Sequence, residues 1–247
     1  MENPDIHLLP SQEPDFHDQF VEHIGRGTFK NAFDSKEVEG CILLKFREFS
    51  IGRCLKGDKV QLQPDDISKT TQEYMQYCYR SKVKLPKILA YCDIQTKEQC
   101  WLIEKVNGIF YKKLPKQEQK IVLEKVTDDQ VIQLFIDFLQ FTVDLGGEAM
   151  LDIYGDNIYY EPSNGFGFID PWDKETLDKT HIKLLNNFFY SFYCLKTSLS
   201  SVIPNPKVFD KIANALKGVN KIKSILDMPN EELLAMINQL EKLQTLK

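Results

Sequence analysis

Two carboxylates and one carboxamide stand at short spacing in the second half of the chain. Asp152 precedes Asn157 by five residues, and Asp170 follows Asn157 by thirteen. A carboxylate can accept the proton of a hydroxyl group, and carboxylate and amide oxygens are ligands that Mg²⁺ takes in proteins. The alternative for each residue is a local hydrogen bond in a turn. Their spacing therefore indicates either a base with two metal ligands or a pair of ordinary turns.

A glycine pair and a lysine in the first fifth of the chain could bind phosphate groups. Gly25 and Gly27 flank Arg26 between two apolar segments, where glycines let backbone N–H groups approach an anion. An ordinary hairpin turn is the alternative. Lys45 lies inside the apolar run CILLKF, and a buried ammonium needs a partner such as a phosphate or the carboxylate of Glu73. A half-exposed strand with Lys45 facing water is equally compatible with this run.

The hydrophobic pattern predicts the elements that must position these residues. Before residue 108 we expect mainly strands, with one helix over 65–80. After it we expect mainly helices and one hairpin. The expected helix at 128–145 is capped by Asp128 or Asp129 and ends at Gly146 and Gly147. The other expected segments are strand–turn–strand at 20–33, strands within 41–46, 85–94 and 99–108, a hairpin from 158–160 to 166–170, and helices at 180–199, 206–217 and 219–247, the last broken at Pro229.

Taken in chain order, these features resemble the protein-kinase-like superfamily. GRGTFKNA resembles the glycine-rich loop G-x-G-x-x-G-x-V, with Lys30 in place of the third glycine and Ala32 in place of the valine. LLKF resembles the V-A-I-K strand, and WLIEKVNG resembles the hinge, with Trp101 near the gatekeeper position. MLDIYGDN at 150–157 aligns with H-R-D-L-x-x-x-N, and Asp170 stands where D-F-G has its aspartate.

The resemblance implies a role for each candidate residue around ATP and Mg²⁺. ATP would lie under the turn formed by Gly25, Arg26, Gly27 and Thr28, while Glu104 to Val106 would contact adenine through their backbone. Lys45, paired with Glu73, would hold the α- and β-phosphates. Asp152 would accept the proton of the acceptor hydroxyl, and Asn157 and Asp170 would bind Mg²⁺.

The resemblance also implies an α+β fold with two lobes. Residues 20–108 would form an N-lobe with a small antiparallel sheet and one helix. Residues 109–247 would form a reduced, mainly helical C-lobe with the catalytic and metal-binding loops, and residues 1–19 would be an N-terminal extension.

Departures from the family pattern leave more than one function open. Met150 and Leu151 replace the His and Arg of the catalytic loop, and Pro171 and Trp172 follow Asp170. These features resemble minimal kinases of the bacterial effector type, which would phosphorylate Ser or Thr of a protein, such as a host protein. Ile169-Asp170-Pro171 is closer to aminoglycoside- and fructosamine-type kinases, whose acceptor is a small-molecule hydroxyl. The third alternative is a pseudokinase that acts as a nucleotide-binding scaffold.

The composition and the charge of the chain exclude several classes of protein. The 247 residues carry a formal net charge of −5 with 43% hydrophobic and 11% aromatic residues, which predicts a folded protein and no nucleic-acid partner. No apolar run is long enough to predict a membrane span. The N-terminal residues lack a signal-peptide pattern, so we expect a cytoplasmic protein, or one secreted into a host cell without a cleavable signal peptide. The six scattered cysteines predict reduced thiols.

Overall fold

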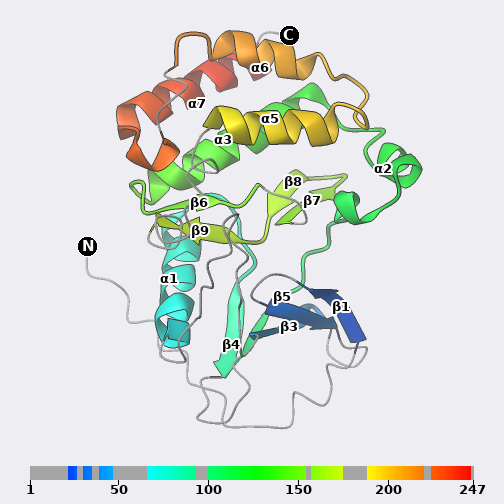
Figure 1. The fold of residues 1–247 in the computed structure, drawn as a ribbon, viewed down its shortest axis with the longest axis vertical. Helices are drawn as coiled ribbons and strands as arrows, with labels where there is room; N and C mark the ends of the chain where they lie inside the picture. The colour runs from blue at the N-terminus through cyan, green and yellow to red at the C-terminus, as the bar shows by residue number, and fades with distance from the viewer. Residues whose placement is uncertain are drawn as a thin grey trace, which may run out of the picture. The chain divides into compact units, whose positions relative to one another are not determined.

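Two compact units make up the chain in the computed structural model (Figure 1). The structure describes residues 22–26, 30–34, 39–46, 66–92, 100–153, 157–174, 188–219 and 224–245. Unit 1 takes the described residues up to 76 and from 86 to 106. Unit 2 takes those from 77 to 85 and from 107 onward. The chain therefore enters unit 2 once, returns to unit 1, and enters unit 2 again after Val106.

Unit 1 is built on a five-stranded antiparallel sheet. Its strands are β1 (Glu22–Arg26), β2 (Lys30–Asp34), β3 (Cys41–Phe46), β4 (Ile88–Cys92) and β5 (Cys100–Glu104). Their spatial order is β1-β2-β3-β5-β4, so β5 pairs with both β3 and β4. The side chains of neighbouring strands therefore share a face wherever the ladder places them opposite each other.

Helix α1 (Asp66–Arg80) contacts strand β5 of this sheet through Trp101. Trp101 of β5 is almost fully buried there and donates an indole hydrogen bond to the Thr71 hydroxyl over 2.7 Å. The ring of Tyr74 lies 5.2 Å from the Trp101 ring, and the Tyr74 hydroxyl donates to the Pro86 carbonyl over 2.8 Å. A large buried aromatic side chain with a satisfied N–H therefore joins α1 to the sheet.

The last turn of α1 and residues 81–85 belong to unit 2. The Tyr77 ring lies 6.2 Å from the Phe141 ring of α3 (Asp128–Asp144), with an edge-on geometry. Arg80 donates to the Glu148 carboxylate over 2.5 Å, and the Lys82 amide donates to the Asp144 carboxylate over 2.7 Å. This segment therefore covers part of α3 and binds polar groups at its C-terminal end.

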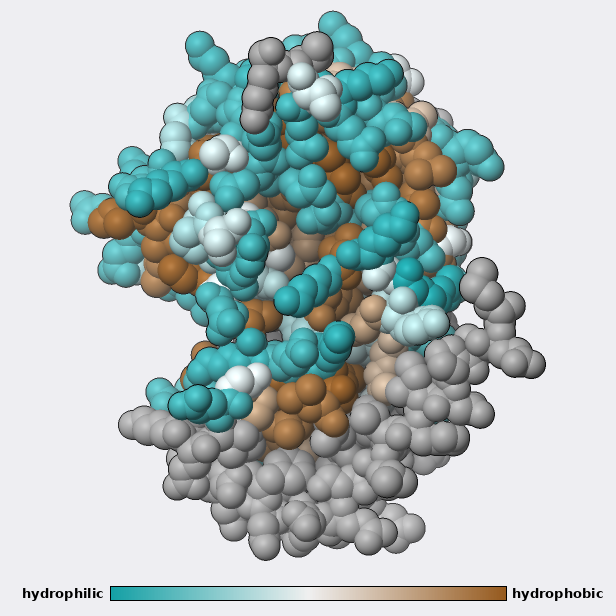
Figure 2. Space-filling view, turned by 180° about the vertical axis from the view of Figure 1, so that it is seen from behind, coloured by the Kyte–Doolittle hydropathy of each residue, from teal (hydrophilic) through white to brown (hydrophobic). Residues whose placement is uncertain are grey.

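Unit 2 is mainly helical, and its hydrophobic core lies around α3. Phe135 and Phe138 of α3 are fully buried and contact the Phe188 ring of α5 (Phe188–Leu199), with ring centroids 6.1 and 6.2 Å apart. Figure 2 shows hydrophilic side chains over most of the visible surface of this unit, with hydrophobic ones between them. Within the part of unit 2 that the structure describes, the other helices are α2 (Lys116–Val122), α6 (Val208–Ala215), α7 (Asn230–Thr245) and the short 3₁₀ helices at Tyr111–Lys113 and Ile225–Asp227.

Two small antiparallel ladders of unit 2 carry the loops of interest. Strand β6 (Ala149–Leu151) pairs with β9 (Pro171–Asp173), and β7 (Ile158–Glu161) pairs with β8 (Gly165–Phe168). The β7–β8 hairpin lies within the chain segment that joins β6 to β9. The residues on either side of the hairpin therefore come together beside the β6–β9 pair.

Tyr159 of β7 packs closely against two glycines. A Cβ atom at either Gly108 or Gly167 would overlap the Tyr159 ring, so both positions require the absence of a side chain. Burial, together with the nearby Glu161 carboxylate, raises the pKa of the Tyr159 hydroxyl. Ile109 forms an isolated two-way backbone bridge with Tyr160, which also holds residues 108–109 against β7.

Most sequence predictions of local structure agree with these elements, and the α+β class agrees with the mixed structure and its small antiparallel sheet. The side chains of α3 that recur at helical spacing are buried, namely Val131, Leu134, Phe135, Phe138, Leu139 and Thr142. The expected cap at Asp128 or Asp129 is wrong, because Thr127 caps this helix. Strands β6 and β9 and helix α2 were not predicted. Residues 1–19 and the beginning of the helix expected at 180–199 lie outside the described residues.

Replacing Thr127 by alanine should destabilise unit 2. The Thr127 hydroxyl accepts the Gln130 amide over 3.2 Å, and the Gln130 side chain accepts the Thr127 amide over 3.1 Å, which forms a capping box. Thr127→Ala should lower the free energy of unfolding by about 1 kcal/mol in denaturant titrations followed by circular dichroism. The matched control is Thr197→Ala, an exposed residue whose hydroxyl donates to the Tyr193 carbonyl of its own helix over 2.8 Å. Equal losses in the two variants would contradict this role of Thr127.

A Gly167→Ala substitution should destabilise the protein through Tyr159. The added methyl group would overlap the Tyr159 ring, and overpacking of this kind costs about 1–3 kcal/mol. In a Tyr159→Ala background, the same glycine substitution should cost much less, which a double-mutant cycle measured by denaturant unfolding would show as a coupling energy. Additive losses would show that the ring is not the obstacle.

Candidate functional site

Asp152, Asn157 and Asp170 come together in unit 2. The Asp152 amide donates to the Asp170 carbonyl over 2.8 Å, directly beyond the last β6–β9 pair, Leu151 and Pro171. The Ile169 amide donates to the Asn157 carbonyl over 3.1 Å, directly beyond the β7–β8 ladder. Each of these two hydrogen bonds extends a ladder by one pair, and together they bring Asp152, Asn157 and Asp170 close to one another.

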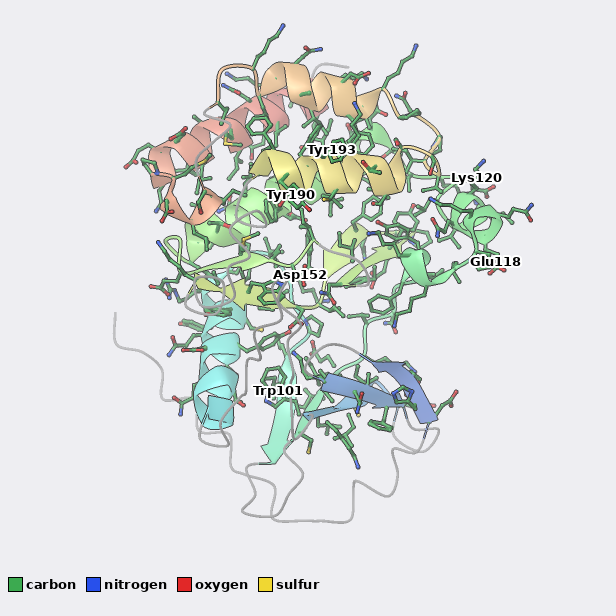
Figure 3. All side chains as sticks on the ribbon, viewed as in Figure 1. Trp101, Glu118, Lys120, Asp152, Tyr190 and Tyr193 are labelled. Atoms are coloured by element: carbon green, nitrogen blue, oxygen red, sulfur yellow. The ribbon has the colours of Figure 1, made fainter. Side chains whose placement is uncertain are left out.

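Asp152 is largely buried, at 8% exposure, and its side chain contacts Asn157 (Figure 3 labels Asp152). The Asn157 amide nitrogen donates to Asp152 Oδ2 over 2.6 Å. This hydrogen bond fixes the orientation of the Asn157 amide, because a carboxylate oxygen only accepts. The Asn157 amide oxygen is consequently directed away from the Asp152 oxygen to which the nitrogen donates.

The donor set of these residues fits a hard divalent cation. An amide oxygen and a partly exposed carboxylate are oxygen ligands of the kind that Mg²⁺ takes, usually together with water and phosphate oxygens. Among the described residues, no group of three or more His, Cys, Asp or Glu side chains could hold a metal by itself. An ion here would therefore need oxygen ligands from a bound phosphate or from water. Asp156 lies outside the described residues.

The glycine pair is only partly within the described residues. Gly25 and Arg26 belong to β1 and pair with Ala32 and Asn31 of β2. Gly27 and Thr28 lie outside the described residues. The two strands expected here are present and pair with each other, and residues 27–29 between them lie outside the described residues.

Lys45 lies on the face of the sheet opposite to that of Trp101. It pairs with Cys100 of β5, while its neighbour Leu44 pairs with Trp101, the residue that contacts α1. The Lys45 ammonium lies 5.5 Å from the centre of the Phe33 ring of β2. Cys41, Leu43 and Cys100 form a buried cluster on this same face, against which Phe33 packs. Lys45 therefore lies at the edge of a small apolar cluster.

Lys30 lies on the opposite face, with Trp101. It is the first residue of β2, and its ammonium lies 4.7 Å from the centre of the Trp101 ring. The sequence pattern marked Lys30 only as the replacement of a glycine. The one sequence signal for Lys30 is its position close to the glycine pair. The face of the sheet on which it lies follows only from the strand register.

The expected hinge residues lie at the end of strand β5 and directly after it. The Glu104 amide donates to the Lys87 carbonyl over 2.9 Å, and the Glu104 carboxylate accepts the Lys87 amide over 3.0 Å. The Lys105 amide donates to the Gly40 carbonyl over 2.9 Å, and its side chain pairs with Asp34. Val106 is half-buried and is the last residue of unit 1. Glu73 is half-buried on α1, two residues after Thr71.

Among the described residues, no helix combines the length and apolar character needed to cross a bilayer. Comparison of the sequence with protein-family models gives no match, and comparison with curated proteins gives none either.

Proposed function

We propose that the protein is an ATP- and Mg²⁺-dependent phosphotransferase that transfers the γ-phosphate of ATP to a hydroxyl group. The first hypothesis for its acceptor is a Ser or Thr of a protein, as in minimal kinases of the bacterial effector type. The observation that carries the proposal is the trio of Asp152, Asn157 and Asp170, joined by the 2.6 Å side-chain hydrogen bond and the 2.8 Å backbone hydrogen bond.

In the proposed reaction, Asp152 orients the acceptor hydroxyl and accepts its proton. The acceptor oxygen forms a bond to the γ-phosphorus while the bond between that phosphorus and the β–γ bridging oxygen breaks, so ADP leaves with the electron pair. The hydrogen bond from Asn157 holds the Asp152 carboxylate in one orientation. Positioning of this kind is a large part of catalysis in phosphoryl transfer.

The metal in this proposal is Mg²⁺, with Asn157 and Asp170 as its protein ligands. It would supply charge neutralisation on the phosphate oxygens. The Asn157 amide can hold Asp152 and bind the metal at the same time. Its nitrogen donates to the Asp152 carboxylate, and its oxygen, which points away from that carboxylate oxygen, would bind Mg²⁺. This division of the two amide atoms explains why an amide, rather than a second carboxylate, stands at residue 157.

Unit 1 supplies the groups for the nucleotide in this proposal. A small antiparallel sheet with one helix precedes the mainly helical unit 2 along the chain, which agrees with the order of lobes that the protein-kinase resemblance implies. Gly25 and its neighbours would bind phosphate through backbone N–H groups, and the segment from Glu104 to Val106 would bind adenine. Lys45, with Glu73 as its carboxylate partner, would bind the α- and β-phosphates.

A small-molecule kinase is the second candidate, and Pro171 favours it. Strand β9 begins at Pro171, immediately after Asp170, so the chain re-enters a ladder without an intervening loop. The Ile-Asp-Pro sequence at this point is the form that resembles aminoglycoside- and fructosamine-type kinases. The acceptor therefore has to be tested with both proteins and small hydroxyl compounds, and transfer to neither would favour the pseudokinase alternative.

Variants at residues 152 and 170 should separate the base from the metal ligand. Asp170→Ala should abolish transfer and weaken Mg²⁺-dependent ATP binding, because a metal ligand is lost. Asp152→Asn should lower the transfer rate by about 10²–10⁴-fold with little change in ATP binding, because only the base is lost. Radiolabelled ATP with lysate proteins and with small hydroxyl acceptors gives the transfer rate, and calorimetric titration gives the affinity for ATP.

The matched control is Asp210→Asn, which replaces an exposed carboxylate of unit 2 that pairs with Lys196 over 3.1 Å. This variant should transfer phosphate like the wild-type protein. Chelation of Mg²⁺ with EDTA should stop transfer in both. Wild-type transfer by Asp170→Ala, with an unchanged unfolding temperature, would overturn the assignment of the metal ligand.

A further inference from the structure

The Gln130 side chain contacts two parts of unit 2 at the same time. In the capping box of α3, its carbonyl oxygen accepts the Thr127 amide over 3.1 Å. A backbone N–H can only donate, so this hydrogen bond identifies the oxygen of the Gln130 amide and directs its nitrogen elsewhere. That nitrogen donates to the Pro162 carbonyl over 3.5 Å, in the turn of the β7–β8 hairpin. The Gln130 amide therefore links the beginning of α3 to the hairpin turn.

Both strands of the hairpin also contact Gln130. The Tyr160 hydroxyl of β7, which belongs to a fully buried side chain, donates to the Gln130 oxygen over 3.5 Å. Gly165, the first residue of β8, has a φ of +87°, and a Cβ atom there would lie 3.3 Å from Gln130 Cγ. The methylene groups of Gln130 thus pack directly on this glycine. One side chain of α3 therefore contacts the first strand, the turn and the second strand of the hairpin.

The other end of the same hairpin carries the proposed metal ligands. Asn157 directly precedes β7, and Asp170 follows the end of β8 by two residues. The Ile169 amide donates to the Asn157 carbonyl over 3.1 Å, so backbone pairing continues to this end. Because the paired strands keep their register, a contact that fixes the turn also fixes the direction in which the far end of the hairpin lies.

We propose that Gln130 is a positioning residue, which holds the β7–β8 hairpin against α3 and thereby places Asn157 and Asp170. This inference rests on the proposed function. A capping box uses glutamate as well as glutamine at this position, since either side chain supplies the accepting oxygen. Only glutamine can also donate to Pro162, because a carboxylate has no proton to give. The hairpin, rather than the cap, therefore explains the amide at residue 130.

Two variants separate the cap from the hairpin contact. Gln130→Glu keeps an oxygen for the Thr127 amide but sets a carboxylate oxygen against the Pro162 carbonyl, so it should loosen the hairpin with little loss of the cap. Thr127→Ala loses the cap and keeps the Gln130 contacts with the hairpin. Thermal unfolding should therefore show a larger fall in the unfolding temperature for Thr127→Ala than for Gln130→Glu.

Hydrogen exchange at the Ile169 amide measures the hairpin without any ligand. This amide donates to Asn157 at the end of the hairpin that carries the proposed metal ligands. In Gln130→Glu it should exchange about tenfold faster, relative to the Phe138 amide in the middle of α3, because the hairpin opens more often. In Thr127→Ala the ratio of the two exchange rates should keep its wild-type value.

Binding and transfer test the link to the proposed metal ligands. Gln130→Glu should lower the affinity for Mg·ATP, measured by calorimetric titration, by about tenfold, since groups that orient metal ligands matter to this extent. The transfer rate should fall with it, whereas Thr127→Ala should transfer phosphate like the wild-type protein. Gln117→Glu, which adds the same charge at an exposed position of α2, is the matched control and should behave like the wild-type protein.

The outcomes distinguish this inference from the proposed function. If either the exchange ratio or the affinity for Mg·ATP keeps its wild-type value in Gln130→Glu, the positioning role is wrong and the function stands. Equal losses of transfer in Gln130→Glu and Thr127→Ala would assign the effect to the cap and would also contradict the inference. A wild-type protein that neither binds Mg·ATP nor transfers phosphate would overturn the proposed function, and the positioning role with it.

Discussion

The hydrogen bond from the Asp152 amide to the Asp170 carbonyl extends the β6–β9 ladder by one pair, at the point where β6 ends and β9 begins. Asp170 follows Asp152 by eighteen positions, and the β7–β8 hairpin lies in the segment between them. A second backbone bond, from Ile169 to Asn157, extends the hairpin ladder in the same way. With both ends fixed by main-chain groups, the Asn157 amide can reach the Asp152 carboxylate. Backbone pairing, rather than side-chain attraction, thus assembles the proposed site.

Elements with a strong hydrophobic period could be predicted from the sequence, and short ones could not. Helix α3 shows its apolar stripe over seventeen residues, and the hairpin shows apolar residues on both sides of a Pro–Ser–Asn–Gly turn. Strands β6 and β9 have three residues each and no alternation, and β9 begins with a proline, which a strand tolerates at its first position. Only their pairing in three dimensions makes them strands. The cap of α3 could have been predicted from the sequence, because Thr127 and Gln130 have the spacing of a capping box.

The residue types of the proposed trio could be predicted, but the face on which a lysine lies could not. CILLKF has no alternation between apolar and polar residues, so its sequence does not show which side chains meet α1. The ladder with β5 decides the matter by pairing Leu44 with Trp101 and Lys45 with Cys100. A shift of the register by one residue would reverse the assignment of both lysines. Strand register is a property of the whole sheet, which is why a local motif is a poor guide to the orientation of one side chain.

The discontinuous make-up of unit 2 limits how the chain can be shortened. A fragment that begins at Asn107 would include α3 and everything after it, but would lack Tyr77–Leu85. Phe141 would then lose the Tyr77 ring, and Asp144 and Glu148 would lose the donors at Lys82 and Arg80. One cut after Val106 therefore yields a truncated product with a newly exposed aromatic side chain. Recombinant versions of the helical unit should retain the 77–85 peptide, for instance by fusing it through a designed linker.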